Sequence, residues 1–452
     1  MATFWKRWGP RRVTRVRTVL AAAVIALLAA ACSATSNGGG NSSGSGSLAG
    51  QTITVAMHYP SPPASMLEKF TKETGIKVRW VQIGFSDLQT KIAAAATSNA
   101  YFADATDVDW SEVGEYAKTH WFVPLNKYFS ASDQADFPQV NAFKVNGQMI
   151  GVPFDSSFVV TTVNTKDFAK AGIKQMPRTI SQLETDLQAL KRSGMANPLN
   201  EFLAATPGLS QCWYQMAAAF GGSIVNSSFS PEFTSPSSAG YKALAWMIEQ
   251  YKNANVPPGD IDNIDYTSFN SEMAQGRTAV TLCDYSGNVA SVYNIPSTSK
   301  VVGQVSYLQT PGLTGPGPVM ANPDGIGIPA AAQHKAAAAK FLQWFTDTEN
   351  QAIWAGLNGP SGTIAAFPLP ARISSLELLA KSDVAKTAEV SQLITLLKHS
   401  EPIIASKAPA GYVSFYNATT TAIHDAAAGT ISVSQAVSTI ASAANQLRSA
   451  SS

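Results

Sequence analysis

Carboxylates and aromatic rings stand together directly after several predicted strands of this chain. In chain order they are Tyr59, Asp109-Trp110, Phe154-Asp155 and Asp284-Tyr285. In open α/β sheets, ligands bind outside the carboxyl ends of the strands, which is where these residues would stand. A sugar presents C–H faces that stack on rings and hydroxyl groups that bond to carboxylates, so these residue types suit a carbohydrate. The competing interpretation is that many of the rings are packed in a core or at a domain interface.

The chain lacks the sequence motifs of common catalytic, phosphate-binding and metal sites. No glycine loop has the phosphate-cradling spacing and no Gly-x-Ser-x-Gly elbow occurs. The histidines are too scattered for a zinc motif: His58, His120, His334, His399 and His424. Asp104, Asp107 and Asp109 are acidic enough for a cation, but Lys118 stands where a calcium loop requires a glutamate. We therefore expect no metal, no cofactor and no enzyme, although two glycosidase carboxylates would leave no motif.

The elements that must position these residues alternate between strands and helices, as is typical of a parallel α/β sheet. Strands are predicted at 52–57, 76–83, 103–108, 158–163, 278–282 and 301–308. Helices are predicted at 65–74, from 86, at 112–118 and 167–171, from 181, in two pieces within 212–251, at 331–346 and as a pair over 409–447. Ser65 with Glu68 and Ser181 with Glu184 have the spacing of capping boxes. Asn146-Gly147 predicts a hairpin turn.

Length and charge divide the chain into a basic leader and a mildly acidic body. The 452 residues exceed the usual size of one hydrophobic core, which favours two domains or one interwoven pair. Six of the 32 Lys and Arg fall within residues 1–31, which hold no acid, so the remaining 26 face 30 Asp and Glu and the body carries about −4. Because phosphate affinity requires clustered cations, the composition argues against a nucleic-acid partner.

The leader has the organisation of an export signal. Thirteen apolar residues, Val19 to Ala31, span about 20 Å as a helix, which is short of the ~30 Å hydrocarbon core. We therefore expect residues 1–31 to be a signal peptide. The end of the run, Leu28-Ala-Ala-Ala-Cys32, resembles the bacterial lipobox, in which the cysteine is lipidated and becomes the mature N-terminus. With the Ser-, Gly- and Asn-rich residues 33–50 as a flexible tether, this predicts a protein anchored at the outer face of the cytoplasmic membrane.

Two further cysteines lie in the body. Cys212 and Cys283 are an even number of cysteines in a chain with an export signal, so one interpretation is a disulfide between them. Two buried free thiols are the other, and the sequence leaves both open.

Taken together, these features resemble the extracellular solute-binding proteins of ABC importers, in particular the large sugar-binding group related to maltodextrin-binding proteins. The likeness covers the body of the chain from about Gln51 to Leu447, and the lipoprotein leader before it is a further point of likeness. Its segments are 53–81, 146–153 (Asn-Gly-Gln-Met-Ile-Gly-Val-Pro), 269–281 (Phe-Asn-Ser-Glu-Met-Ala-Gln-Gly-Arg-Thr-Ala-Val-Thr), 325–329, 346–362 and 425–437. Their order and spacing carry the resemblance.

The resemblance implies a periplasmic-binding-protein-like α/β fold, in which two lobes are joined by a hinge of three crossings and close on a ligand between them. The crossings would lie near 155–160, 319–322 and 362–369. Lobe one would comprise 51–156 plus 322–365, and lobe two 157–321 plus 366–452, after a lipidated tether at 32–50.

The resemblance also implies a set of ligand-binding residues. Carried onto this chain they are His58, Tyr59, Asp109, Trp110, Asp155, Trp213, Tyr214, Tyr285, Phe415 and Tyr416, to which its place after a strand adds Asp284. Tyr285, Trp213 and Tyr416 are expected to stack on the sugar, and Asp109 and Asp155 to accept its hydroxyl groups. Thr420 stands where maltodextrin-binding relatives carry an arginine, which argues against a maltodextrin ligand.

The predicted function is therefore capture of a small carbohydrate outside the cell and its delivery to the membrane permease of an ABC importer, by a monomer. One alternative keeps the fold and binds a polyamine, whose ammonium groups would pair with the same carboxylates and rings. A second alternative is an exported carbohydrate-active enzyme.

Overall fold

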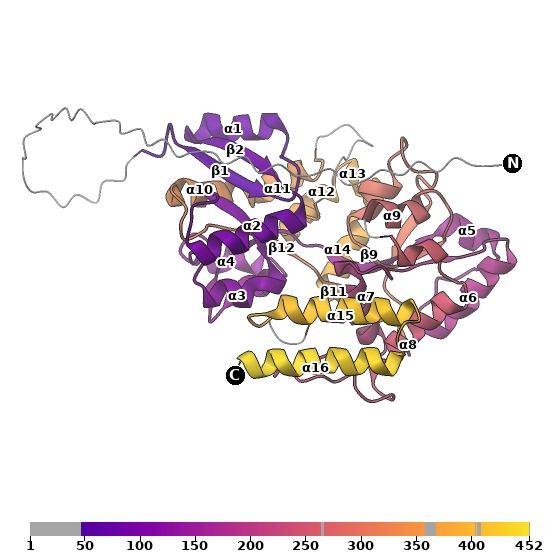
Figure 1. Ribbon diagram of the computed structural model, residues 1–452. Coiled ribbons are helices and arrows are strands. Elements are labelled where there is room, and N and C mark those ends of the chain that lie inside the picture. The colour runs from indigo at the N-terminus through magenta and orange to yellow at the C-terminus, as the bar shows by residue number, and fades with distance from the viewer. Residues whose placement is uncertain (1–46, 264–265, 358–367, 403, 405–407, 452) are drawn as a thin grey trace, which may run out of the picture. The chain divides into compact units, whose positions relative to one another are not determined.

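The computed structural model describes residues 47–263, 266–357, 368–402, 404 and 408–451. These residues belong to one compact unit, Ser47–Ser452. Its main strands form two sheets of mixed direction with helices packed against them, which confirms the expected α/β class (Figure 1). The predicted signal peptide, Cys32 and most of the predicted tether lie outside the described residues.

The first sheet has the strand order β2-β1-β3-β12-β6. Its strands are β1 (Thr52–Met57), β2 (Lys77–Gln82), β3 (Ala105–Asp109), β6 (Val152–Asp155) and β12 (Asp324–Gly327). β1 pairs in parallel with β2 and β3, whereas β12 runs antiparallel to both β3 and β6. The carboxyl ends of β1, β3 and β6 and the amino end of β12 therefore share one edge of the sheet.

Helices cover both faces of the first sheet, which explains why β1 is apolar on both sides. Val55 packs with Phe70 and Phe341 on one face, whereas Ala56 joins Leu88 on the other. The helices of this part are α1 (Ala64–Thr74), α2 (Phe85–Ser98), α3 (Val113–Lys118), α4 (Ala131–Ala135), α10 (Lys335–Phe345) and α11 (Thr348–Trp354).

The second sheet has the order β13-β11-β7-β9-β8, with β10 paired to β7. Its strands are β7 (Phe158–Asn164), β8 (Leu199–Asn200), β9 (Val280–Tyr285), β10 (Val305–Leu308), β11 (Val319–Ala321) and β13 (Ser400–Pro402). β7 is buried along its whole length because it also lies between two cores: Val159 and Val163 face one, Phe158 and Val160 the other. Helices from before and after β9 in the sequence contribute side chains to these two cores.

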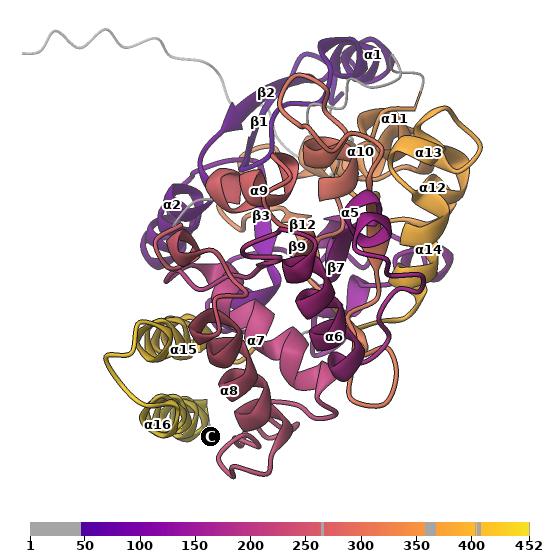
Figure 2. The same ribbon diagram turned by 90° about the vertical axis from the view of Figure 1, so that its right-hand side faces the viewer.

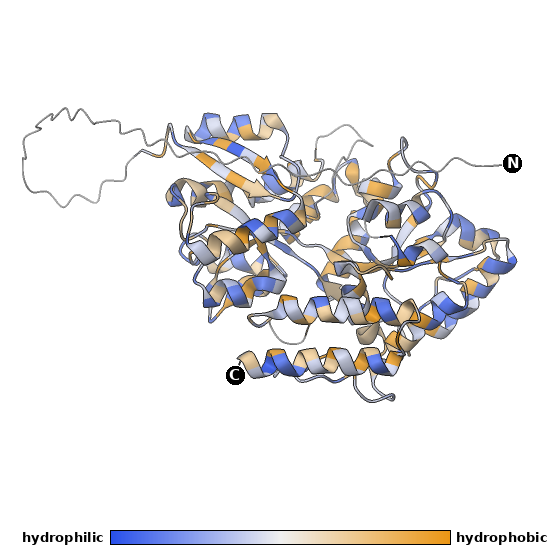
Figure 3. Ribbon diagram, in the orientation of Figure 1, coloured by the Kyte–Doolittle hydropathy of each residue, from blue (hydrophilic) through white to orange (hydrophobic). Residues whose placement is uncertain are grey.

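The helices around the second sheet include the longest ones of the described residues. They are α5 (Thr165–Lys170), α6 (Ile180–Arg192), α7 (Pro207–Ala219), α8 (Ala239–Lys252), α9 (Tyr266–Ala274), α12 (Ile373–Leu379), α13 (Val384–Thr387), α14 (Val390–Lys398), α15 (Tyr412–Ala427) and α16 (Val433–Ser451). α15 and α16 lie side by side in both views (Figures 1 and 2). Both carry alternating hydrophobic and hydrophilic stripes, as amphipathic helices packed on a core do (Figure 3).

The chain passes between the two sheets over very short segments. β6 ends at Asp155 and β7 begins at Phe158, while β11 ends at Ala321 and β12 begins at Asp324. The two passages are joined where the N–H of Asn322 donates to the carbonyl of Ser157 over 2.8 Å. Residues 368–370 run beside the first passage, because Asp155 forms an isolated bridge with Pro370. The predicted third crossing, 362–369, falls mostly outside the described residues.

Several local predictions agree with the structure and two are wrong. The hairpin forms, with Lys144–Val145 paired to Gln148–Met149 around Asn146-Gly147. The predicted capping box at Ser65 is wrong, since α1 begins at Ala64 after Pro63 without a side-chain cap. The box at Ser181 is displaced, because Thr179 and Gln182 form it instead. Within the described residues, no helix combines the length and the apolar character that crossing a membrane requires.

Candidate functional site

Three aspartates lie side by side at the shared edge of the first sheet. Asp324, the first residue of β12, is registered against Asp109 at the end of β3 and against Asp155 at the end of β6. Asp107 lies two residues before Asp109, so strand alternation places both side chains on the same face. We call Asp107, Asp109, Asp155 and Asp324 the carboxylate cluster.

Two residues from the loop after β1 bond to this cluster. The Nδ1 atom of His58 forms a short hydrogen bond with Asp107, and its Nε2 lies 4.0 Å from the carboxylate of Asp324. The hydroxyl of Tyr59 donates to Asp155, and its oxygen lies 3.3 Å from Oδ2 of Asp324. The loop after β1 thus supplies one cation and one phenol to the carboxylate cluster.

Burial and mutual repulsion set the protonation of the cluster. Burial raises the pKa of Asp155 to about 6, and burial together with the neighbouring aspartates raises that of Asp324 well above its usual range. Burial would lower the pKa of His58, but the negative charge and hydrogen bond of Asp107, together with the charges of Asp324 and Asp155, outweigh this effect and raise it to about 9. At neutral pH His58 is therefore a cation, and the cluster carries less negative charge than four carboxylates suggest.

A group of rings gathers at the carboxyl ends of β8 and β9 in the second sheet. Tyr285 ends β9, and its ring centroid lies 5.6 Å from Tyr266 and 6.3 Å from Phe202. Tyr416 of α15 is within electrostatic range, since it is among the groups that raise the pKa of Tyr285 after burial. We call Phe202, Tyr266, Tyr285 and Tyr416 the ring platform.

Residues that adjoin the two groups contact one another. The indole nitrogen of Trp110, the residue after Asp109, donates to Oδ1 of Asn322 over 2.9 Å, and its ring lies 5.8 Å from that of Tyr412. After burial and its tyrosine neighbours, Asp109 contributes to raising the pKa of Tyr416. Hydrogen bonds also lead from Trp110 through Asn322 and Gln211 to Tyr285, so the surroundings of the carboxylate cluster and the ring platform are continuous.

The structure brings together most of the residues predicted from the sequence, but it places four of them in the interior. His58, Tyr59, Asp109, Trp110, Asp155, Tyr285 and Tyr416 belong to the two groups or to the contacts between them. Trp213, Tyr214 and Phe415 are instead enclosed in the core of the second sheet. Trp213 is 0% exposed and donates its indole N–H to the carbonyl of Gly240, so its predicted role in stacking a sugar is wrong.

Asp284 is the fourth of these residues. It is fully buried, and it accepts hydrogen bonds from Thr162 over 2.5 Å, from Tyr293 over 2.7 Å and from the amide of Asn288. Its Oδ1 also accepts the backbone N–H of Tyr285 over 2.8 Å. With its acceptor positions occupied, Asp284 supports the end of β9 and offers nothing to a ligand.

Some residues of the two groups were not predicted. Phe202 and Tyr266 belong to the ring platform, Asp107 and Asp324 to the carboxylate cluster. Asp324 had a usable signal, since it stands just past the predicted second crossing at 319–322. Phe202 and Tyr266 had none, because only the pairing of β8 with β9 brings Phe202 beside Tyr285.

The open question about the cysteines is answered by the structure. Cys212 of α7 and Cys283 of β9 form a disulfide, with their Cα atoms 5.1 Å apart and a sequence separation of 71. The bridge is buried and adjoins the ring platform, because Tyr285 follows Cys283 by two residues. It ties the helix behind the platform to the strand that carries it.

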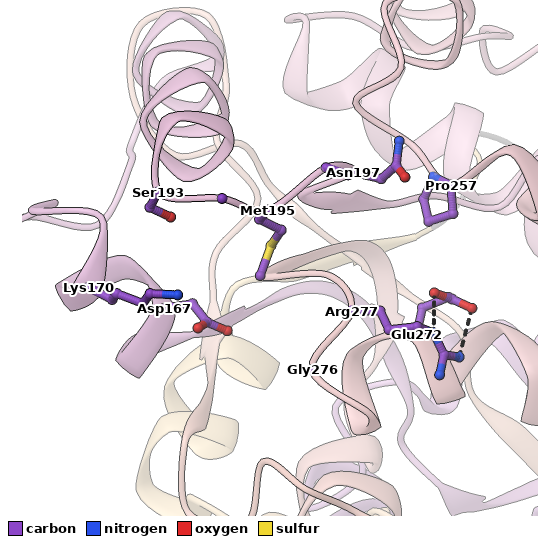
Figure 4. Close-up of a pocket in the computed structure, with 11 residues that line it drawn as sticks. Asp167, Lys170, Ser193, Met195, Asn197, Pro257, Glu272, Gly276 and Arg277 are labelled. Atoms are coloured by element: carbon purple, nitrogen blue, oxygen red, sulfur yellow. Dashed lines mark hydrogen bonds and ion pairs between the residues drawn. The ribbon is translucent and has the colours of Figure 1, made fainter.

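A separate hollow of about 580 Å³ lies at the opposite, amino end of β8 and β9 (Figure 4). Its wall carries the ion pair of Glu272 with Arg277, joined at 2.8 Å, and the side chains of Asp167 and Lys170. None of the predicted site residues lines it. Among the described residues, no group of three or more His, Cys, Asp or Glu side chains is arranged to hold a metal ion.

Relatives are found by sequence at low identity. A probable amino-acid ABC transporter periplasmic-binding protein of Sinorhizobium fredii is 23% identical over 321 residues, 68% of this chain and 70% of the relative. The diacetylchitobiose binding protein DasA of Streptomyces coelicolor is 24% identical over 313 residues, 67% of this chain and 70% of the relative.

Solved structures share the fold over almost the whole chain. Maltose-bound MalE3 of T. maritima superimposes with a TM-score of 0.73 at 19% identity, covering 88% of this chain and 99% of that one. A solute-binding protein of Agrobacterium radiobacter K84 in complex with ribitol gives a TM-score of 0.74 at 20% identity, covering 89% and 99%. Both agree with the periplasmic-binding-protein-like fold. Residues 59–352, well over half of the chain, match the family model of bacterial extracellular solute-binding proteins, and the chain belongs to that family.

Proposed function

We propose that this protein captures a small carbohydrate or polyol outside the cell for an ABC importer. The observation that carries the proposal is the pairing of a ring platform from the second sheet with a carboxylate cluster from the first, connected through Trp110 and Asn322. Rings offer apolar faces to the C–H groups of a sugar, and carboxylates accept hydrogen bonds from its hydroxyl groups. The solute contacts we propose are His58, Tyr59, Asp109, Trp110, Asp155, Asp324, Tyr266, Tyr285 and Tyr416.

The charges at the site favour a neutral polyol over a polyamine. An ammonium ligand needs ionised carboxylates without a competing cation. Here His58 already occupies the cationic position, bonded to Asp107, and burial together with the neighbouring aspartates favours the protonated form of Asp324. A sugar hydroxyl bonds to a carboxyl group in either protonation state.

The names of most of these relatives and neighbours support a carbohydrate or polyol ligand, and one name points to an amino acid. DasA is named for diacetylchitobiose, and the structural neighbours were solved with maltose and ribitol. The relative from Sinorhizobium is named for an amino acid. An amino acid would need a basic partner for its carboxylate, and neither the ring platform nor the carboxylate cluster contains a lysine or arginine. The cationic His58 is already bonded to Asp107.

Binding without chemistry, followed by transfer to a permease, is the role that family membership supports. In this proposal lobe one (51–156 plus 322–365) and lobe two (157–321 plus 366–452) close around the sugar, and the closed form docks on the permease. A lipid on Cys32 holds the monomer at the outer face of the membrane, which rests on the leader sequence alone. Metabolic labelling with a radioactive fatty acid should label the wild type and leave a Cys32→Ala variant unlabelled.

Calorimetric titration tests the ligand class. Diacetylchitobiose, maltose, ribitol, spermidine and glutamate are each titrated into the protein, and the sugars are afterwards analysed for hydrolysis. We expect one of the three sugars or polyols to bind intact and to lose at least about fivefold in affinity in Tyr285→Ala, because a stacked ring contributes about 1 kcal/mol or more. Tyr101→Ala is the matched control, because Tyr101 is 39% exposed and precedes β3, at the end of that strand opposite to Asp109. Binding of spermidine or glutamate alone would refute the carbohydrate assignment, and hydrolysis would indicate an enzyme.

A further inference from the structure

We infer that Gln211 orients the hydroxyl of Tyr285 so that this hydroxyl faces the solute only as a hydrogen-bond acceptor. Gln211 lies in α7 immediately before Cys212 and is partly exposed beside the ring platform. The inference rests on the proposed function, since it takes the ring platform to be where the solute binds. It adds Gln211 as a residue that determines whether a solute hydroxyl donates or accepts the hydrogen bond at Tyr285.

The direction of the hydrogen bonds follows from a residue that can only donate. The indole N–H of Trp110 has no acceptor function, and it donates to Oδ1 of Asn322 over 2.9 Å. The same Oδ1 accepts from Nε2 of Gln211 over 3.3 Å, so the amide nitrogen of Gln211 must face Asn322. The amide oxygen of Gln211 is left for Tyr285.

That oxygen takes the only proton that Tyr285 has. The hydroxyl of Tyr285 lies 2.9 Å from Oε1 of Gln211 and donates to it. A phenol that has given its proton can only accept further hydrogen bonds. Burial raises the pKa of Tyr285 well above its usual range, so the phenol keeps that proton. Among the described residues, the hydroxyl oxygen of Tyr285 has one further contact, at 3.4 Å with the hydroxyl of Tyr266, so it can still accept a hydrogen bond. A solute hydroxyl that contacts this oxygen must therefore be the donor.

The disulfide holds both ends of this arrangement in place. Gln211 precedes Cys212 by one residue and Tyr285 follows Cys283 by two, and the bridge joins the two cysteines. Cys283 has φ +58, in the left-handed region that non-glycine residues seldom occupy, next to a register shift between β7 and β9. This irregularity lies two residues before Tyr285, at the end of β9.

A double-mutant cycle tests the inference on the ligand that binds best among diacetylchitobiose, maltose and ribitol. We expect Tyr285→Phe to weaken binding about tenfold, since a solute hydroxyl loses its acceptor, and Gln211→Leu to weaken it about fivefold. In the Gln211→Leu background the hydroxyl is no longer oriented, so Tyr285→Phe should then change the affinity less than about twofold. Gln188→Leu, at an exposed position of α6, is the matched control and should leave the affinity unchanged. Additive losses in the cycle would overturn the inference.

A second measurement on the unliganded protein keeps the two proposals separable. The indole N–H resonance of Trp110, assigned by its absence in Trp110→Phe, reports on the shared acceptor Asn322. Gln211→Leu should shift this resonance at an unchanged melting temperature, and Gln188→Leu should not. If the resonance stays in place, Gln211 does not share that acceptor and the inference fails even where sugar binds. If no sugar binds but the resonance shifts, the proposed function fails while the hydrogen-bond direction stands.

Discussion

The hydroxyl of Tyr59 donates a hydrogen bond to the carboxylate of Asp155, which lies 96 residues further along the chain. Tyr59 follows β1, whereas Asp155 ends β6 at the point where the chain leaves the first sheet. The other oxygen of this carboxylate accepts the N–H of Leu369 over 2.9 Å. A single buried aspartate therefore connects the loop after β1 to the backbone of Leu369, at the point where the chain leaves the first sheet.

Asp155→Asn should weaken solute binding by about tenfold, because the amide turns a donor toward the hydroxyl of Tyr59. It should also change the pH dependence of stability. The pKa of Asp155 is about 6, above its usual 3.8, so the folded protein holds more protons between about pH 4 and 6 than the unfolded chain does. The free energy of unfolding then falls on the order of 2 kcal/mol as the pH rises through that window. Urea unfolding should show a smaller decline in Asp155→Asn than in the wild type, because other buried acids such as Asp186, whose pKa burial raises to about 6, keep their own contribution.

The control for this comparison is the exposed Asp262, whose replacement by Asn should leave the wild-type pH profile in place. An Asp155→Asn variant with the full decline would mean that another group titrates there.

From the pKa of His58 we expect a second decline in the free energy of unfolding, at higher pH. Its pKa of about 9 lies above the usual 6.5, so its ion pairs stabilise the folded protein fully below about pH 6.5 and are lost as the pH rises through 9. The side chain is 20% exposed, so we expect a loss on the order of 1 to 2 kcal/mol rather than the full value. His58→Gln should flatten unfolding curves between about pH 6.5 and 9.5, whereas His399→Gln, at an exposed position, should not.

Trp213 and Tyr285 should respond in opposite ways to truncation. Trp213 is enclosed by the core and bonded to Gly240 over 2.8 Å, so Trp213→Ala should lower the free energy of unfolding by about 3–5 kcal/mol. Tyr285 is partly exposed, and Tyr285→Ala should mainly reduce solute affinity. Chemical unfolding and calorimetry on both variants test the distinction; a Trp213→Ala variant of normal stability that binds no solute would restore Trp213 to the site.

The disulfide should contribute both stability and site geometry. Replacing Cys212 and Cys283 by serine removes a bridge that closes 71 residues, for which about 2–4 kcal/mol of stability is typical. Because the bridge also anchors Gln211 and Tyr285, we expect solute affinity to fall at temperatures where the variant is still folded. Equal affinity in the folded serine variant would show that the bridge acts on stability alone.

Much of the fold could be predicted from local patterns. Alternating apolar residues and turn signals predicted β1, the hairpin at Asn146-Gly147 and the paired helices α15 and α16, because each depends on neighbouring residues in the chain. Helix starts were less predictable, as Ser65 shows, since a cap depends on backbone direction as well as residue type.

The site divides along the same line. Local patterns were enough to predict the residue types and the sheet edge at which His58, Tyr59, Asp109 and Asp155 stand, because strand ends are local features and parallel strands share an edge. Three outcomes follow from the three-dimensional packing alone: Trp213 lies in the core while Tyr285 belongs to the ring platform, Asp324 joins the other carboxylates, and Cys212 pairs with Cys283. These outcomes depend on which distant elements pack together, and burial, ion pairing and hydrogen-bond partners arise only from that packing.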